Sequence, residues 1–282
     1  MKITLIGVGL IGGSMALKLK DKGLASFVYG VDQSEAHLTE AQQLGIIDEM
    51  ASLEYAVAHS DLVILAIPVD ASREMLPEIL NLVDDTQTVM DAGSTKEGIV
   101  DAVNDHPKRD RFVAFHPMWG TENSGPKSAL SESFTGKAAV ICDREHSAED
   151  ALKTVELVAE NLDMHLIYMK AQDHDIHTAY ISHISHITSY ALANTVLEKE
   201  REEDTIFQLA SSGFSSTVRL AKSHPEMWVP IFKQNKENVL DVLNEHISQL
   251  RKFKSALEKD NDELLEELIR NANKIRGILG EK

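Results

Sequence analysis

The chain begins with KITLIGVGLIGG at residues 2–13, an apolar run that passes directly into closely spaced glycines. The spacing of Gly7, Gly9 and Gly12 predicts a strand, a tight turn and a helix, in that order. Gly7 would allow the turn, Gly9 would leave room for phosphates against bare backbone, and Gly12 would let the helix pack closely on the sheet. A second apolar run ends at Asp32. The combined pattern is typical of a βαβ unit that binds a dinucleotide.

Two features around this turn indicate which dinucleotide the unit would bind. The helix after the turn presents unpaired N–H groups and a partial positive charge to phosphates. Asp32 lies where a carboxylate accepts hydrogen bonds from the adenosine ribose, and it would repel a 2′-phosphate. No arginine or lysine follows it in Gln33, Ser34 and Glu35, although NADP binding normally needs such a cation. The sequence therefore predicts NAD, bound around Gly7, Gly9, Leu10, Ile11, Gly12 and Asp32.

The composition narrows the class of protein. The chain has 282 residues and a formal net charge of −17, which argues against binding to nucleic acid or to an anionic membrane. Cys142 is the single cysteine, so we expect neither a disulfide nor a cysteine-based zinc site. No apolar run reaches the roughly 18 residues of a membrane-spanning helix. We expect a cytoplasmic protein of two domains.

Short apolar runs recur through the first half of the chain. They lie at residues 61–67, 88–91, 112–115, 138–142 and 165–168. Runs of this kind, rich in β-branched residues, suit strands that are buried on both faces, as in a parallel sheet. Ser147 would be the N-cap of the helix before the last of these strands. We therefore expect an α/β, Rossmann-type domain with a mostly parallel sheet over residues 1–169.

From Lys170 onward, helical periodicity replaces the strand pattern. Apolar residues step by three and four through 239–257, and a second stripe runs through 264–279. Such stripes are typical of amphipathic helices. We interpret them as core packing in an all-α domain over residues 170–282. The same leucine-rich stripes favour a homodimer formed through this domain.

Chemistry is expected where the strands of the sheet end, because ligands of open α/β sheets bind beyond the carboxyl ends of the strands. His116 leaves one strand there, and beside a nicotinamide it could accept a proton from a hydroxyl while hydride leaves the same carbon. Ser94 leaves the neighbouring strand and could bond the same hydroxyl or the nicotinamide amide. Lys96 would be either a charge for the substrate or a solvated lysine. Pro68 lies at a further exit and is predicted to contact the cofactor.

The helical half opens with a dense group of histidines. His183 and His186 lie three residues apart, which suits one face of a helix. We rank a metal site below a substrate-binding or structural role, because no pair of carboxylates accompanies them at ligand spacing. Further on, a run of small residues leads into Arg219, and a guanidinium can bind a carboxylate through two parallel hydrogen bonds. A surface arginine is the equal alternative there.

Taken together, these segments resemble the prephenate dehydrogenase family over nearly the whole chain. The resemblance is carried by GVGLIGGS at 7–14, LAIPV at 65–69, DAGSTK at 91–96, HPMWGTENSG at 116–125, HD at 174–175, SHISH at 182–186, Gly213-Phe214, Thr217, Arg219 and PEMW at 225–228. It implies oxidative decarboxylation of prephenate by NAD⁺ to 4-hydroxyphenylpyruvate, CO₂ and NADH, a step of tyrosine biosynthesis. Aromatisation drives such a reaction, so the enzyme mainly positions groups and supports developing charge.

The resemblance also implies roles for individual residues. His116 would hydrogen-bond the ring hydroxyl and polarise it as hydride departs, with Ser94 assisting. Arg219 would bind a substrate carboxylate. The remaining substrate-binding residues that it implies are His186, Gly213, Glu122 and Trp228.

This chain departs from the family pattern at a few positions. Trp119 replaces a common alanine and could reshape the mouth of the pocket, and Ser185 replaces a proline between the two histidines. Ser215 and Ser216 stand where relatives often have an Arg-Asp pair, so an ion pair that uses that acid is in doubt, although Glu122 remains.

Three alternative functions are considered, and the residues argue against the second and third of them. Arogenate dehydrogenase acts on a substrate with an amine in place of the keto group, and one sequence does not separate the two. A 3-hydroxyacid dehydrogenase would rely on a catalytic lysine in its helical domain. A non-catalytic NAD-sensing regulator would dispense with the set His116, Ser94 and Arg219 and would add a partner-binding element.

Overall fold

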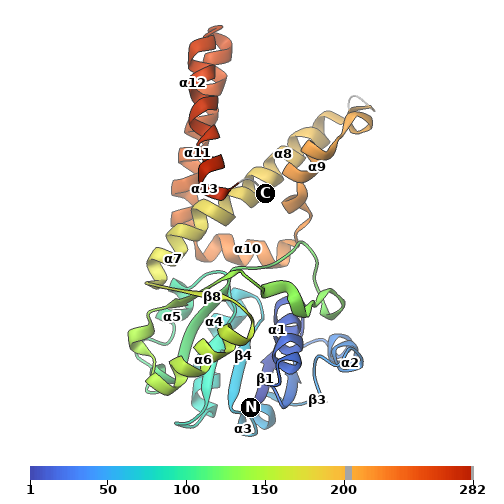
Figure 1. Cartoon of the computed structure of the whole chain (residues 1–282), viewed down its shortest axis with the longest axis vertical. Coiled ribbons are helices and arrows are strands. Elements are labelled where there is room, and N and C mark those ends of the chain that lie inside the picture. Colours follow the sequence, from blue (N-terminus) through green and yellow to red (C-terminus); the bar gives the residue numbers. More distant parts are fainter. Residues whose placement is uncertain (201–204, 281–282) are drawn as a thin grey trace. The chain divides into compact units, whose positions relative to one another are not determined.

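Figure 1 shows the computed structural model, which describes residues 1–200 and 205–280. Contacts within the chain group Met1–Lys236 as one compact unit and Glu237–Lys282 as a second. The change from strands to helices falls at Lys170, as the sequence predicts. The assignment of 170–282 as one functional domain stays a prediction, and its residues 201–204 and 281–282 lie outside the described residues.

The first unit is built on a sheet of eight strands in the order β3-β2-β1-β4-β5-β6-β7-β8. The strands are β1 (Lys2–Ile6), β2 (Phe27–Val31), β3 (Glu49–Met50), β4 (Leu62–Leu65), β5 (Thr88–Asp91), β6 (Phe112–Pro117), β7 (Ala138–Cys142) and β8 (His165–Met169). The strands from β3 to β6 run parallel, whereas β7 is antiparallel to β6 and β8 is parallel to β7. The prediction of a mostly parallel sheet is confirmed.

Two apolar cores lie on the two faces of this sheet. Alternate residues of each central strand point to opposite faces, so Ile64 joins one core while Val63 and Leu65 join the other. Helices α1 (Leu10–Asp21) and α6 (Glu149–Asn161) supply the first core. The second is supplied by α3 (Leu53–Ala58), α4 (Val69–Leu82) and α5 (Glu97–Asp101). Helix α2 (Glu35–Gln43) lies beside β3.

Three local predictions differ from the structure. Strand β8 is an edge strand whose side chains are mostly exposed, so it is not buried on both faces. Helix α6 has Ala148 as its N-cap residue, because the Ser147 hydroxyl donates instead to the carbonyl of Phe112 at 2.8 Å. Strand β3 is only two residues long and is missing from the sequence prediction.

Helices cover the edge of the sheet at which the parallel strands end (Figure 1). Helix α7 contacts α5, and α10 contacts α4. The elements in this part are α7 (Ala171–Thr178), a π-helical turn η5 (Ala179–His183), α8 (Ile184–Glu200), α9 (Ser212–Thr217), a short 3₁₀ helix η7 (Arg219–Lys222) and α10 (Pro225–Gln234). The π-helical turn matters for function, because such turns are frequent at functional sites and this one ends at His183.

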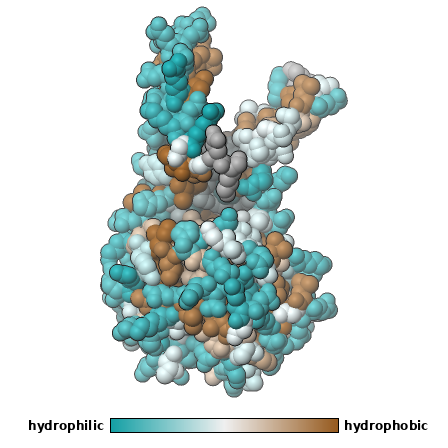
Figure 2. All heavy atoms as spheres, in the orientation of Figure 1, coloured by the Kyte–Doolittle hydropathy of each residue, from teal (hydrophilic) through white to brown (hydrophobic). Residues whose placement is uncertain are grey.

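The second unit consists of α11 (Lys236–Glu258), α12 (Asp262–Asn273) and α13 (Ile275–Leu279). The predicted helices are confirmed, but their interpretation as core packing within the chain is wrong for much of the stripe. Leu250 and Leu257 are 56% and 64% exposed, and α12 has no buried residue within the described part of the chain. Figure 2 shows brown apolar atoms along these helices among teal polar ones. Within the described residues, much of the apolar face of these helices is exposed.

Within residues 1–200 and 205–280, no helix is long and apolar enough to cross a membrane.

Candidate active site

A cavity of about 690 Å³ opens at the carboxyl ends of the parallel strands, where the sequence predicts the chemistry. Its volume lies within the usual range for sites that bind small molecules. The predicted site residues that line it are Gly9, Leu10, Ile11, Pro68, Ser94, His116, His186, Arg219 and Trp228. Trp119 also lines the cavity and packs edge-to-face on Phe134.

The glycine turn after β1 has the geometry that its spacing predicts. Gly7 has φ +93°, and a Cβ there would lie 2.4 Å from the carbonyl oxygen of Ala66. A Cβ on Gly12 would lie 2.3 Å from the carbonyl oxygen of Gly7, so only glycine lets α1 approach this closely. At Gly9, by contrast, a Cβ would meet no atom within 4 Å. Open space therefore lies in front of the backbone at the position assigned to the phosphates.

The surroundings of this turn fit a dinucleotide. Helix α1 has no acidic residue in its first turn and no side chain that caps it, so its N-terminus can attract an anion. The carboxylate of Asp32 accepts hydrogen bonds from the backbone N–H groups of Val8 at 3.1 Å and Ser34 at 2.9 Å. It is thereby held against the turn. A carboxylate has about four acceptor sites, so acceptor capacity is left for ribose hydroxyls.

His116 lies in β6 at the cavity wall and is only 9% exposed. Its Nδ1 lies 2.8 Å from Nε2 of His174, and Nδ1 of His174 lies 2.8 Å from Oδ1 of Asp175. Burial lowers the pKa of His116 well below its ordinary value, and His174, Lys96 and His183 lower it further. His116 is therefore a neutral imidazole at neutral pH, as a proton acceptor must be.

Both alternatives for Lys96 are wrong. Its side chain is fully buried and forms an ion pair with Asp91, and it does not line the cavity. Asp91 also accepts hydrogen bonds from the N–H groups of Gly93 at 2.9 Å and Phe115 at 3.2 Å. This buried pair therefore ties together the two strand exits that carry Ser94 and His116.

The histidines of the helical half separate into different environments. His183 and His186 both line the cavity, and burial lowers the pKa of each to about 4. His186 stacks on Trp228 with ring centroids 3.4 Å apart. His177 is exposed on α7 and does not line the cavity. Among the described residues, no three His, Cys, Asp or Glu side chains form a group that could hold a metal ion.

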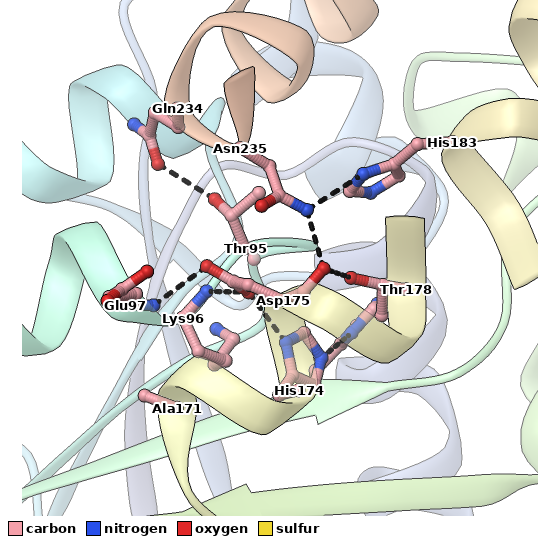
Figure 3. A network of polar contacts seen from close by, with 12 residues as sticks. Thr95, Lys96, Glu97, Ala171, His174, Asp175, Thr178, His183, Gln234 and Asn235 are labelled. Carbon is pink, nitrogen blue, oxygen red and sulfur yellow. Dashed lines mark hydrogen bonds and ion pairs between the residues drawn. The ribbon is translucent and has the colours of Figure 1, made fainter. Parts of the chain in front are cut away.

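Asn235 is a buried residue that the sequence prediction does not identify. Its Nδ2 donates to the backbone carbonyl of Asp175 at 2.7 Å, and the same nitrogen lies 3.1 Å from Nδ1 of His183 (Figure 3). Because an amide nitrogen only donates, Nδ1 of His183 accepts, and the ring proton of this neutral histidine is on Nε2. The Nε2–H group of His183 is thus a hydrogen-bond donor.

Arg219 lies on the more open side of the cavity. Its Nη1 forms an ion pair with Oε2 of Glu122 at 2.9 Å, with side chains 52% and 25% exposed. Glu122, the acid that remains where relatives often have a second one near Ser215 and Ser216, is thus the partner of Arg219. Gly213 does not line the cavity, and its carbonyl accepts hydrogen bonds from the hydroxyls of Ser216 and Thr217.

Comparisons with known proteins agree with this geometry. Two family models match consecutive parts of the chain: the nucleotide-binding domain of prephenate dehydrogenase at residues 15–168 and its dimerization domain at 170–271. The prephenate dehydrogenase of Bacillus subtilis is 31% identical over 97% of this chain and 75% of that protein. The cyclohexadienyl dehydrogenase of Zymomonas mobilis is 30% identical over 94% of this chain and 91% of that protein.

A solved structure extends the likeness to three dimensions. The prephenate dehydrogenase of Aquifex aeolicus, crystallised with hydroxyphenyl propionate and NAD⁺, superposes with a TM-score of 0.88. It is 32% identical in sequence, and the match covers 99% of this chain and 98% of that one. Together with the glycine turn, which precedes the first matched segment, these findings indicate an NAD-dependent enzyme. The chain belongs to the prephenate dehydrogenase family.

Proposed function

We propose that this protein catalyses the NAD-dependent oxidative decarboxylation of prephenate to 4-hydroxyphenylpyruvate, CO₂ and NADH in tyrosine biosynthesis. The observation that carries the proposal is a buried neutral histidine, His116, at the wall of a cavity that begins at the glycine turn. Such a histidine is suited to take the proton of a hydroxyl whose carbon gives up hydride.

The cofactor would be held at the turn between β1 and α1. Gly9, Leu10 and Ile11 would face the pyrophosphate, Asp32 would accept from the adenosine ribose, and Pro68 would line the approach to the nicotinamide. Gly7 and Gly12 would act indirectly, because they shape the turn. Bound NAD⁺ supplies the acceptor for the hydride.

The reacting part of the substrate would lie between β5 and β6. His116 would accept the hydrogen bond of the ring hydroxyl and take its proton, and Ser94 would bond the same oxygen from the neighbouring strand exit. After CO₂ has left, the phenolate oxygen would recover the proton from His116. The protein thus holds one proton for part of the cycle and returns it to the product.

The two carboxylates of the substrate need cations or donors on an acidic protein. Arg219 would bind one of them, which requires that it release or share Glu122. His186 and Trp228 would lie against the side chain of the substrate. The indole N–H of Trp228 is buried and has no partner among the described residues, so a substrate oxygen would satisfy it. Gly213 would contribute only if α9 moved toward the cavity.

Arogenate is the second candidate substrate, and the likeness to a cyclohexadienyl dehydrogenase keeps it open. The test is NADH formation by the purified protein with prephenate and with arogenate, each against NAD⁺ and NADP⁺. We expect turnover with prephenate and NAD⁺. Turnover with arogenate alone would change the substrate and keep the mechanism. NAD binding without turnover of either substrate would favour the NAD-sensing regulator instead.

We also propose that two chains associate through the helices after Lys170. The exposed apolar side chains of α11 to α13 support this, since a face of this kind in one chain is a typical contact surface. The cytoplasm remains the expected location, from the single cysteine.

A further inference from the structure

His174 and Asp175 are buried behind His116, and neither of them lines the cavity. They are 1% and 2% exposed. Figure 3 shows Asp175 surrounded by donors: its carboxylate accepts from the backbone N–H groups of Lys96 at 2.8 Å and Glu97 at 3.0 Å. Nδ1 of His174 lies 2.8 Å from the same carboxylate, beside these two backbone N–H groups.

The contact with the Asp175 carboxylate determines where the protons of the two histidines lie. A carboxylate only accepts, so Nδ1 of His174 carries a proton and its Nε2 holds a lone pair. That lone pair faces Nδ1 of His116 at 2.8 Å, so Nδ1 of His116 carries the proton of that hydrogen bond. In the neutral ring, the remaining nitrogen of His116, Nε2, must then hold a lone pair.

We propose that His174 and Asp175 are positioning residues that hold His116 in the one tautomer able to accept a proton at Nε2. When His116 accepts that proton, His174 takes up the resulting positive charge. The inference rests on the proposed function, because it concerns the same hydroxyl proton. Without the two partners, His116 could place its proton on either nitrogen, and the tautomer with Nε2–H could not act as the base.

The proton movements balance. As the O–H bond of the substrate breaks, an N–H bond forms at Nε2 of His116, and its Nδ1 proton can pass to Nε2 of His174. The cation then lies on His174, whose Nδ1–H points to the carboxylate of Asp175. These movements reverse when the phenolate oxygen recovers its proton.

The charges around His116 support this location for the cation. Burial is the largest factor that lowers the pKa of His116, and Lys96, on the side of β5, lowers it further. Burial also lowers the pKa of His174, but there Asp175 and Asp91 act in the opposite direction and favour the charged form. A positive charge is therefore better tolerated one ring farther from the cavity.

The first test measures the tautomer directly and needs neither cofactor nor turnover. The whole protein is labelled with ¹⁵N-histidine, and the resonances of His116 are assigned by their loss in His116→Asn. We expect a protonated, pyrrole-type nitrogen at Nδ1 and an unprotonated, pyridine-type nitrogen at Nε2. The opposite assignment in the wild-type protein would overturn the proposal, whatever the activity.

The second test separates the two roles of His174, which are to fix the tautomer of His116 and to take up the positive charge. His174→Leu removes both roles. We expect its kcat to fall by about 10- to 100-fold, the usual scale for the loss of an orienting partner. The KM for prephenate should stay within about threefold of the wild-type value, since the cavity wall is unchanged. His174→Gln can still accept from His116 and donate to Asp175, so it should restore the tautomer and part of the lost kcat.

The matched control is His177→Gln, an exposed histidine of the same helix, which should keep wild-type kcat. Equal kcat in His174→Leu and His177→Gln would contradict the proposal. The proposal would also be contradicted if His174→Gln kept the expected tautomer of His116 but had a kcat no higher than that of His174→Leu. The tautomer would then have no effect on turnover. A wild-type protein that turns over neither prephenate nor arogenate would instead refute the proposed function, and the tautomer measurement would still stand.

Discussion

The two sides of the cavity differ in burial and in how their charges are paired. On the side of β6, His116, His174 and Asp175 are buried and joined by hydrogen bonds of 2.8 Å. On the opposite side, Arg219 is half exposed and pairs with Glu122, a single acid. We call these the buried side and the open side.

This difference suggests that the two sides of the cavity have different tasks, one in the chemistry and one in substrate recognition. The buried side is fixed before substrate arrives, so it needs no reorganisation during the reaction, and its interactions are strengthened by the low polarity around them. The open side holds its cation in a weak, solvent-screened pair, which a substrate carboxylate can replace at little cost. Chemistry is thus assigned to the rigid side and recognition to the exchangeable one.

The largest effect is expected at the centre of the buried side. His116→Asn should lower kcat by roughly two to four orders of magnitude, the usual scale for loss of a general base. NAD affinity should change little, because His116 is not part of the glycine turn. Steady-state kinetics with prephenate and NAD titration by fluorescence would check both parts. Unchanged turnover would remove His116 from the mechanism.

A substitution on the open side is expected to have a smaller effect, and to act on the KM for prephenate and not mainly on kcat. Arg219→Gln should raise the KM for prephenate by about 10- to 100-fold, as expected for the loss of a charged hydrogen bond worth about 1.5–3 kcal/mol. Its kcat should fall far less than that of His116→Asn. A normal KM would refute the carboxylate role, and a loss confined to kcat would show that the two sides are not functionally separate.

How far the sequence could predict this arrangement follows from the range of the contacts involved. Strands β4, β5 and β6 were predictable because strands buried on both faces leave continuous apolar runs. His116 and Ser94 were predictable because the ends of parallel strands meet at one edge. Both depend on local patterns.

The errors arise where a contact joins distant segments. Lys96 looks solvated in the sequence, and only the fold shows that it is buried against Asp91. Asn235 contacts Asp175 across 60 positions of the chain, and no local pattern marks that pairing. The hydroxyl of Ser147 bonds a carbonyl 35 residues away instead of capping its own helix. The apolar stripes after Lys236 show the periodicity of a helix but not what covers it.

The buried histidines also predict how stability depends on pH. Burial lowers the pKa of His183 and His186 to about 4, below the ordinary value of 6.5. Between pH 6.5 and pH 4 the unfolded chain binds protons that the folded chain does not. The free energy of unfolding is therefore largest above pH 6.5 and decreases as the pH falls. We expect a loss on the order of 1–2 kcal/mol per histidine by about pH 5.

Thermal unfolding at several pH values would measure this slope. His183→Gln should make the slope shallower, because one of the linked groups is gone. His177→Gln, on the exposed face of α7, is the matched control and should leave the slope as it is. A wild-type slope in His183→Gln would mean that the ring of His183 is not held neutral by the buried side.

The smallest effect is expected from the acid of the open side. The pair of Glu122 and Arg219 is partly exposed to solvent, and exposed pairs contribute about 0–1 kcal/mol. Glu122→Gln should therefore shift the melting temperature by no more than about 4 °C. Because the substrate would no longer have to displace a carboxylate from Arg219, its KM should fall, by up to about fivefold for 1 kcal/mol. A KM that rises about tenfold would instead place Glu122 in direct contact with the substrate, and the open side would then be as specifically built as the buried one.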